Sequence, residues 1–269
     1  MKLETARVLS HEQLYENTFL MWLSCPPVAR GASPGRFLMV HCADGYDPLL
    51  PRPMSFHRFR PDADARSGRA SARERQGERQ FAILYDVRGR GTAWLCERQP
   101  GDELTVFGPL GKGYAVNSQA QNLLLVAGGL GVAAVVALAD EAVTAGRAVT
   151  LLQGARNAAK LFPPESLPRE VEVLSATDDG SAGHRGPVTD LLAGHLSWAD
   201  QVFACGPSAM FRSMADVLRE ARTRKPVQAL LEERMGCGTG ICYGCAVFTR
   251  RGVRLVCKDG PRFELREVF

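Results

Sequence analysis

The spacing of apolar residues changes character along the chain. Up to about residue 115, short runs of β-type residues such as Phe37 to His41, Phe81 to Val87 and Glu103 to Phe107 are separated by proline and glycine signals. From Asn122 onward, apolar runs such as Ala148 to Leu152 alternate with alanine-rich stretches of helical length. The first pattern predicts an antiparallel β-barrel, and the second predicts a doubly wound parallel sheet.

A third region, Val227 to Phe269, follows a predicted helix over Ser208 to Thr223 and is too short for a conventional hydrophobic core. It nevertheless holds four of the chain's eight cysteines. A metal centre bound by these thiols would supply the cohesion that the segment lacks. We therefore expect three domains, with boundaries at residues 1–116, 117–225 and 226–269.

The composition indicates a folded chain with no membrane span. Of its 269 residues, 45% are hydrophobic and 23% are charged, which is typical of soluble globular proteins. The longest uncharged run, residues 113–139, contains several glycines and is better explained by a strand, a turn and a helix. The first ten residues, MKLETARVLS, lack the apolar core of a secretory signal, so we expect a cytoplasmic location.

The net charge of +4 does not indicate a nucleic-acid partner, because most of the excess falls in one segment. Between Arg58 and Arg79 there are seven arginines and four acidic residues. This segment has almost no large apolar side chains and cannot bury enough surface to order itself. We expect a flexible, solvated hairpin insertion at about residues 60–79, with contact to a negatively charged partner as the alternative.

The cysteines near the C-terminus have a diagnostic spacing. Cys237, Cys242 and Cys245 form a C-x4-C-x2-C run, and Cys257 follows at a distance, which is the arrangement of plant-type 2Fe-2S ferredoxins. Glycines in and beside the run allow the loop to wrap closely around a cluster: Gly236, Gly238, Gly240 and Gly244. A structural zinc site is the alternative, but zinc ribbons usually present two short paired cysteine elements. The spacing therefore favours a 2Fe-2S cluster with these four ligands.

A glycine-rich turn opens the second region. Gly128, Gly129 and Gly131 follow a predicted strand and begin a predicted helix in LLLVAGGLGVAA. Backbone N–H groups and the helix dipole at such a turn can face a pyrophosphate. The alternative is a turn that only permits close packing of strand and helix.

A second turn of the same kind strengthens the nucleotide hypothesis. Cys205, Gly206 and Pro207 again join a strand to a helix, so this loop should lie at the same carboxyl edge of the sheet. Cys205 is also explained as a small buried residue. Arg156 follows the strand that ends near Leu152 and is a candidate for binding an adenosine ribose or phosphate. The alternative, that Arg156 is simply exposed to solvent, fits the sequence at least as well.

Two sets of residues in the barrel region are suited to bind a phosphate and the edge of an aromatic ring. The first combines a cation, a rigid proline and a hydroxyl: Arg52, Pro53, Met54 and Ser55. The second lies where a strand ends and a glycine turn opens a short helix: Leu84, Tyr85, Asp86, Gly91 and Thr92. Taken alone, each of these groups is more often an ordinary turn.

In this order, the motifs resemble those of the electron-transfer subunits of heteromeric, NAD-linked dihydroorotate dehydrogenases, in the ferredoxin-NADP reductase superfamily. The stretches that carry the resemblance are RPMS, VRGRGT, FGPLGKGY, AGGLGVA, ATDDGSAGHRGPVTDLL, ACGPSAM and LEERMGCGTGICYGCAVFTRRGVRLVCKDGPRF. The resemblance implies FAD bound by the two barrel groups, NAD at the two glycine turns and a 2Fe-2S cluster on the four cysteines. The fold class expected is an antiparallel FAD-binding β-barrel, a doubly wound NAD-binding sheet and a small 2Fe-2S module.

The resemblance also implies a function in pyrimidine biosynthesis. An FMN-containing catalytic subunit would oxidise dihydroorotate, and electrons would pass through the cluster and FAD of this chain to NAD+, in a heterotetramer with two subunits of each kind. The chain has no length left for an orotate-binding (β/α)8 barrel of roughly 250 residues, so that active site would belong to the partner. The alternative is a similar flavin and iron–sulfur subunit that serves a hydrogenase or a ferredoxin-linked enzyme. NADP also remains an alternative to NAD, because Arg156 is suited to a 2′-phosphate.

Overall fold

The structure is a computed structural model that describes residues 1–61 and 79–269. The expected insertion at about residues 60–79 falls almost entirely on 62–78, outside the described residues. The strands on either side of it are β5 (Arg58–Pro61) and β6 (Arg79–Asp86), and they pair antiparallel. The two arms of the predicted hairpin are thus present at its base.

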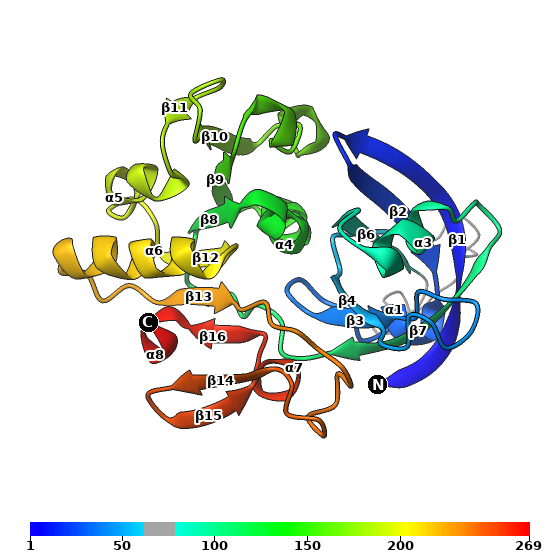
Figure 1. The fold of residues 1–269 in the computed structure, drawn as a ribbon. Coiled ribbons are helices and arrows are strands. Elements are labelled where there is room, and N and C mark those ends of the chain that lie inside the picture. The colour runs from blue at the N-terminus through cyan, green and yellow to red at the C-terminus, as the bar shows by residue number, and fades with distance from the viewer. Residues whose placement is uncertain (62–78) are drawn as a thin grey trace, which may run out of the picture.

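The first part of the chain forms an antiparallel sheet with strand order β4-β3-β7-β1-β2-β6-β5 (Figure 1). Its other strands are β1 (Lys2–Tyr15), β2 (Thr18–Ser24), β3 (Phe37–Val40), β4 (Arg52–Ser55) and β7 (Glu103–Leu110). Two register shifts between β1 and β2 mark bulges, which bend a strand and help a sheet to curl. The antiparallel architecture predicted from the short β-type runs is confirmed.

Alternate residues of these strands fill the interior of the curled sheet, as a period of two requires. Ala6 and Val8 of β1, Met21 and Leu23 of β2, and Ile83 of β6 belong to one buried cluster. Two short helices, α1 (Pro26–Ala29) and α3 (Arg90–Cys96), contribute to the same cluster. This core places the ends of β4 and β6 at the rim of the sheet. These strands carry residues that are predicted to bind a phosphate and an aromatic ring.

The second sheet has the order β11-β10-β9-β8-β12-β13-β16, and its neighbours are parallel except for β13 and β16. Its strands are β8 (Asn122–Gly128), β9 (Ala148–Ala155), β10 (Val171–Thr177), β11 (His184–Arg185), β12 (Gln201–Cys205), β13 (Val227–Leu230) and β16 (Arg262–Glu264). The connecting elements are η1 (Gly129–Gly131), α4 (Val132–Thr144), η2 (Ala158–Lys160), η3 (Pro164–Ser166), η4 (Val188–Leu191), α5 (Leu192–His195) and α6 (Ser208–Glu220).

The central strand β8 shows why helices cover both faces of this sheet. Leu123 and Leu125 pack in one buried cluster with α4, whereas Leu124 and Val126 pack in another cluster with α6. Successive side chains of a strand point to opposite faces, so a continuous apolar run needs cover on each side. The doubly wound sheet is therefore confirmed, although α6 ends at Glu220 rather than at Thr223.

The C-terminal segment packs on both sheets. It contains the hairpin β14 (Ala246–Thr249) and β15 (Gly252–Leu255), followed by α7 (Val256–Asp259) and α8 (Leu265–Val268). Cys245, Cys257 and Phe263 share a buried cluster with Met39 of the first sheet and Met214 of α6. In addition, β13 and β16 extend the second sheet, so the segment shares the core of its neighbours. The three domain boundaries remain a prediction.

Within residues 1–61 and 79–269, no helix combines the length and the apolar character that crossing a membrane requires.

Candidate functional site

The four predicted cluster ligands come from two places near the C-terminus. Cys237, Cys242 and Cys245 lie between β13 and β14, and Cys257 lies in α7, where its N–H points at Cys245 Sγ. All four are free thiols. Among the described residues, no three histidine, cysteine or acidic side chains gather around one point as the ligands of a single ion would. Four free thiols are the number that a 2Fe-2S cluster with cysteine ligands requires.

Backbone N–H groups point at the sulfurs of this loop. The N–H of Thr239 lies 3.4 Å from Cys237 Sγ, and that of Gly244 lies 3.5 Å from Cys242 Sγ. A third N–H, from Cys257, lies 3.4 Å from Cys245 Sγ. Such donors stabilise negative charge on thiolate ligands and tune the reduction potential of a bound cluster.

The same contacts shift the protonation of the thiols. Burial acts to raise the pKa of Cys237, but hydrogen bonds with Thr239 and Cys242 outweigh it and lower the pKa to about 5. Burial raises the pKa of Cys257 to about 12, and the contact with Cys245 adds to this effect. Iron binding requires all four thiols to be deprotonated.

Two glycines fix the path of the cysteine loop. Gly238 and Gly240 adopt φ angles of +69° and +85°, which favour glycine. A Cβ at Gly238 would lie 2.9 Å from Met39 Cγ of β3 and 2.9 Å from Leu110 Cδ1 of β7. The loop is therefore held directly against the first sheet, and the positive φ angles that the clustered glycines led us to expect are present at these two positions.

The first barrel group borders a cavity of about 400 Å³, here called the inner cavity. Its lining combines strand β4, the two glycine turns and the chain after β13, and includes Pro53, Ser55, Leu130, Cys205, Glu232 and Met235. The volume lies within the range of small-molecule sites. Pro53 and Ser55 thus line this cavity, and their contact with a ring remains a prediction.

The structure brings the two barrel groups together. A Cβ at Gly91 would lie 2.8 Å from Arg52 Nε, so the guanidinium packs directly over the turn that opens α3. Arg52 also donates a hydrogen bond to the carbonyl oxygen of Leu50. A fixed cation beside the first turn of a helix is suited to a phosphate.

The remaining barrel candidates have structural partners. Met54 and Tyr85 are buried in the core of the first sheet, and Leu84 packs against the second. The hydroxyl of Tyr85 lies 2.8 Å from Nε2 of His11. Because the side chains of Met54, Leu84 and Tyr85 pack inside the protein, any contact of these residues with a cofactor would be made by their backbone. The predicted cofactor contacts remain a prediction.

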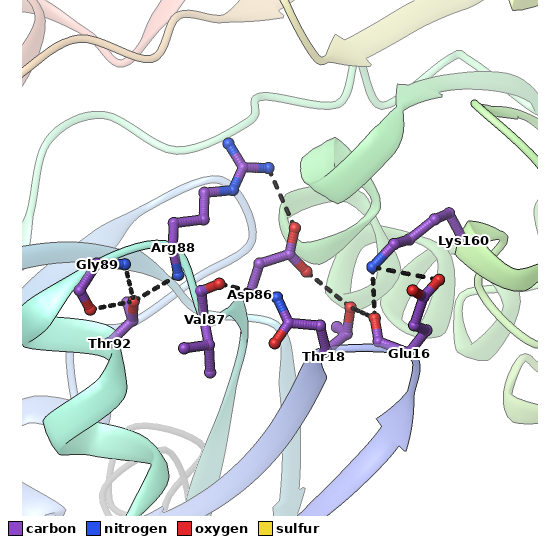
Figure 2. A network of polar contacts seen from close by, with 9 residues as sticks. Glu16, Thr18, Asp86, Val87, Arg88, Gly89, Thr92 and Lys160 are labelled. Atoms are coloured by element: carbon purple, nitrogen blue, oxygen red, sulfur yellow. Dashed lines mark hydrogen bonds and ion pairs between the residues drawn. The ribbon is translucent and has the colours of Figure 1, made fainter.

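Thr92 uses its hydroxyl within its own turn, as Figure 2 shows. Its Oγ1 accepts hydrogen bonds from the N–H groups of Arg88 (2.8 Å) and Gly89 (3.2 Å), and it lies 3.1 Å from the Gly89 carbonyl oxygen. The side chain therefore shapes the turn and leaves other N–H groups of α3 to face an anion.

Asp86 and Lys160 continue the network shown in Figure 2. Asp86 accepts a hydrogen bond from the hydroxyl of Thr18 at 2.7 Å and one from Nη2 of Arg88 at 3.1 Å. Lys160, from the second region, donates to the carbonyl oxygen of Glu16 at 2.6 Å. The network orients Arg88 and links the loop after β9 to the first sheet.

The two glycine turns lie against each other at the edge of a second cavity, of about 530 Å³, here called the outer cavity. A Cβ at Gly131 would lie 2.0 Å from the Cys205 carbonyl oxygen, and one at Gly128 would lie 2.9 Å from Pro207 Cδ. Both positions therefore require glycine for close approach. The prediction that the turns share one edge of the sheet is confirmed.

Four charged residues line the outer cavity: Arg88, Arg156, Asp178 and Glu232. Arg156 and Asp178 directly follow β9 and β10. Arg156 was a candidate from the sequence, whereas the other three were not. An acid one or two residues after a strand of a parallel sheet is the signal that could have identified Asp178 and Glu232.

Glu232 lies where the two cavities meet. It lines both of them, as does Leu130. The Cys205 thiol donates a hydrogen bond to Glu232 Oε1 at 3.8 Å. Burial raises the pKa of Glu232, although Arg88 and Cys205 oppose this shift. An acid with a shifted pKa that lines two adjoining cavities is a typical feature of a functional site.

Comparison with known proteins gives one family and its close relatives. Residues 232–269 match the family described as the iron-sulfur cluster binding domain of dihydroorotate dehydrogenase B. The chain is 35% identical to the electron transfer subunit of dihydroorotate dehydrogenase B (NAD(+)) from Desulforamulus reducens, over 97% of this chain and 96% of the relative. It is 36% identical to the corresponding subunit from Bacillus caldolyticus, over 98% of each chain.

Solved structures share the fold. An NADH-dependent reduced ferredoxin-NADP oxidoreductase, described in connection with flavin-based electron bifurcation, is 27% identical with a TM-score of 0.78, covering 98% of this chain and 89% of that one. The ferredoxin reductase of carbazole 1,9a-dioxygenase is 18% identical with a TM-score of 0.64, covering 82% and 65%. The second likeness supports the architecture alone.

Proposed function

This chain belongs to the family of electron transfer subunits of dihydroorotate dehydrogenase B, and we propose that it delivers electrons from a catalytic partner subunit to NAD+. A flavin exchanges electrons singly or as a hydride, an iron–sulfur cluster passes them one at a time, and NAD+ accepts a hydride. A subunit in this role needs three adjoining sites, with the flavin in the middle.

The adjacency of the three sites is the observation that carries the proposal. The cysteine loop packs on Met39 of β3, and Phe37 of the same strand lines the inner cavity. The inner cavity then adjoins the outer cavity at Leu130 and Glu232. These shared walls support an order from cluster to flavin to nucleotide.

The residues around each site suggest which part of a cofactor they would hold. Arg52 and the turn at Gly91 would hold the pyrophosphate of FAD, while Pro53 and Ser55 would contact its ring system. The glycine turns at Gly128 to Gly131 and at Cys205 to Pro207 would receive the nicotinamide nucleotide. The cluster would take its four thiolates from Cys237, Cys242, Cys245 and Cys257.

A patch of exposed apolar side chains marks where the partner would dock. Ile241 and Tyr243 of the cysteine loop are 80% and 66% exposed, and Leu50 is 52% exposed. A Cβ at Gly236 would lie 3.8 Å from Leu50 Cδ2, so this patch continues across the loop. Exposed apolar patches are typical of protein interfaces. We infer that an FMN-containing catalytic subunit covers it, in a complex with two subunits of each kind.

Steady-state turnover of the reconstituted complex tests this proposal. The chain is combined anaerobically with the FMN-containing subunit from the same source, and dihydroorotate-dependent formation of NADH is followed. The proposal requires turnover that depends on both chains. If both subunits carry their cofactors and no NADH forms, a different electron donor serves this chain.

A ferredoxin is the donor to try next in that case. The structural relative that is 27% identical, a reduced ferredoxin-NADP oxidoreductase, is the observation that favours it. NADH formation with reduced ferredoxin, and none with dihydroorotate and the catalytic subunit, would replace the proposed function by this one.

A further inference from the structure

Strand β3 presents different side chains on its two faces, as the alternation of a strand requires. Leu38 belongs to the core inside the curled first sheet, whereas Phe37 and Met39 belong to the buried cluster that also contains Cys245 and Cys257. Phe37 lines the inner cavity as well. One face of a single strand therefore contacts both the segment that carries the predicted cluster ligands and the cavity proposed for the flavin.

Two contacts fix this segment to the first sheet. A Cβ at Gly238 would lie 2.9 Å from Met39 Cγ and 2.9 Å from Leu110 Cδ1, so the backbone of the cysteine loop rests directly on these side chains. Beyond the last cysteine, the N–H of Lys112 donates to the Gly260 carbonyl oxygen at 2.6 Å. The segment is thus held near the start of the cysteine run and again after its end.

A layer of three buried side chains lies between Gly238 and the inner cavity. Met39 and Leu110, which contact the loop, are 1% and 3% exposed, and Phe37, which borders the cavity, is 4% exposed. Phe37 is the register partner of Leu110 across β3 and β7, and it lies two residues from Met39 on the same face of β3. A side chain at position 238 would add to the thickness of this layer.

Electron transfer between two bound groups slows steeply as their separation grows, so the fold that holds both groups must fix that separation. We propose that Gly238 is a positioning residue that sets the distance between the cluster and the flavin. Because it has no side chain, the loop rests directly on Met39 and Leu110, and the adjacent ligand Cys237 is held with it. This inference rests on the proposed function, in which electrons cross this layer.

Internal electron transfer in the loaded chain, without the partner subunit, tests the role of Gly238. The chain with FAD and cluster is mixed anaerobically with NADH, and the reduction of FAD and then of the cluster is followed by stopped-flow absorbance. Gly238→Ala should slow the second step by about three- to tenfold, as expected for a displacement of about 1 Å. Its iron and FAD contents should match those of the wild type.

A second readout measures the separation itself and needs no turnover. The dipolar coupling between the reduced cluster and one-electron-reduced FAD, measured by electron paramagnetic resonance, weakens as the two groups move apart. It should decrease in Gly238→Ala.

Gly240→Ala is the matched control. Gly240 has a φ of +85°, so alanine strains the loop backbone there as it does at Gly238. Its new Cβ would meet Cδ of Lys258 at 2.9 Å, and this flexible, exposed side chain can move aside. The transfer rate and the dipolar coupling of Gly240→Ala should therefore stay at the wild-type values.

Two further variants act from the side of the sheet. Adding Met39→Ala to Gly238→Ala makes room for the new methyl group, so the rate and the coupling should recover toward those of Met39→Ala alone. Met39→Phe leaves Gly238 in place and enlarges the layer. It should slow the same step, and it decides the question if Gly238→Ala retains no cluster.

The outcomes separate this inference from the proposed function. Wild-type transfer in Gly238→Ala, equal slowing by Gly240→Ala, or wild-type transfer in Met39→Phe would each overturn the role of Gly238. If internal transfer responds as expected but the complex forms no NADH from dihydroorotate, the inference stands and the electron donor is a different one. If NADH reduces the FAD of the wild-type chain and the cluster stays oxidised, both the inference and the proposed function fail.

Discussion

The Cys205 thiol and the Glu232 carboxylate lie 3.8 Å apart at the wall between the inner and outer cavities. In the proposed function the flavin and the nicotinamide meet at this junction. Burial, the charge of Glu232 and their hydrogen bond together raise the pKa of the thiol, so Cys205 is a neutral S–H donor and not a nucleophile. The pair is thus arranged to position ring groups by hydrogen bonding.

Glu232 makes the stability of the protein depend on pH. Its pKa is raised in the folded state, so its stabilising contribution is complete below its unfolded pKa and is lost as the pH rises through the folded value. Glu232→Gln removes this titration. The urea midpoint of the variant, relative to that of the wild type, should therefore increase from pH 4.5 to pH 8. A difference between the two proteins that does not change with pH would refute the assignment.

Arg88 should contribute to nucleotide binding. It lines the outer cavity, and Asp86 holds its guanidinium in place at 3.1 Å. Arg88→Gln should weaken NADH binding by about three- to tenfold, the loss of one charge-assisted contact. It should also raise the pKa of Glu232 further, because Arg88 lowers it.

Fluorescence titration with NADH measures the effect of Arg88→Gln on binding. Arg90→Gln is the matched control, since Arg90 pairs with Asp47 on the surface and does not line the outer cavity. Equal affinities of the two variants would show that Arg88 makes no contact with the nucleotide.

Arg52 and Gly91 should act together in binding FAD. Arg52→Ala removes the cation from the turn and should weaken FAD binding roughly tenfold to a hundredfold, as expected for a charge-assisted hydrogen bond. Gly91→Ala should have a similar but smaller effect, because the new Cβ would lie 2.8 Å from Arg52 Nε and displace it. Flavin content after dialysis measures both. Full FAD occupancy in Arg52→Ala would refute the role.

Cys242→Ser should remove the cluster and loosen the C-terminal segment. The segment shares its core with the two sheets, and metal binding adds cohesion that packing alone does not supply. Iron content should fall to background, and Tm should fall by roughly 5 °C or more, corresponding to a few kcal/mol. Cys96→Ser, in helix α3 of the first region, is the control and should keep its iron. Native iron content in Cys242→Ser would refute the ligand assignment.

Much of this architecture could be predicted from local patterns. The cysteine spacing indicated four candidate cluster ligands, and the apolar run before Gly128 indicated a strand of a doubly wound sheet. Each of these features could be recognised from its pattern along the chain. The glycine turns could be placed at one edge of the sheet because parallel strands end there.

The remaining features depend on contacts between distant segments. Glu232 joins the two cavities only because β13 extends the second sheet, and the three-residue strand β16 is too short to be identified from its pattern. Arg88 reaches the outer cavity through the relative placement of the two sheets. The use of the Thr92 hydroxyl within its own turn is likewise visible only in the folded chain.

The central claim is that electrons from the partner's substrate reach NAD+ through this chain. Its most direct test is to mix the anaerobic two-subunit complex with dihydroorotate in the absence of NAD+, following flavin absorbance and the electron paramagnetic resonance of the cluster. The account predicts that the FAD and the cluster of this chain become reduced, and that added NAD+ reoxidises them with formation of NADH. Reduction confined to the FMN of the partner, with the FAD and cluster remaining oxidised, would contradict it.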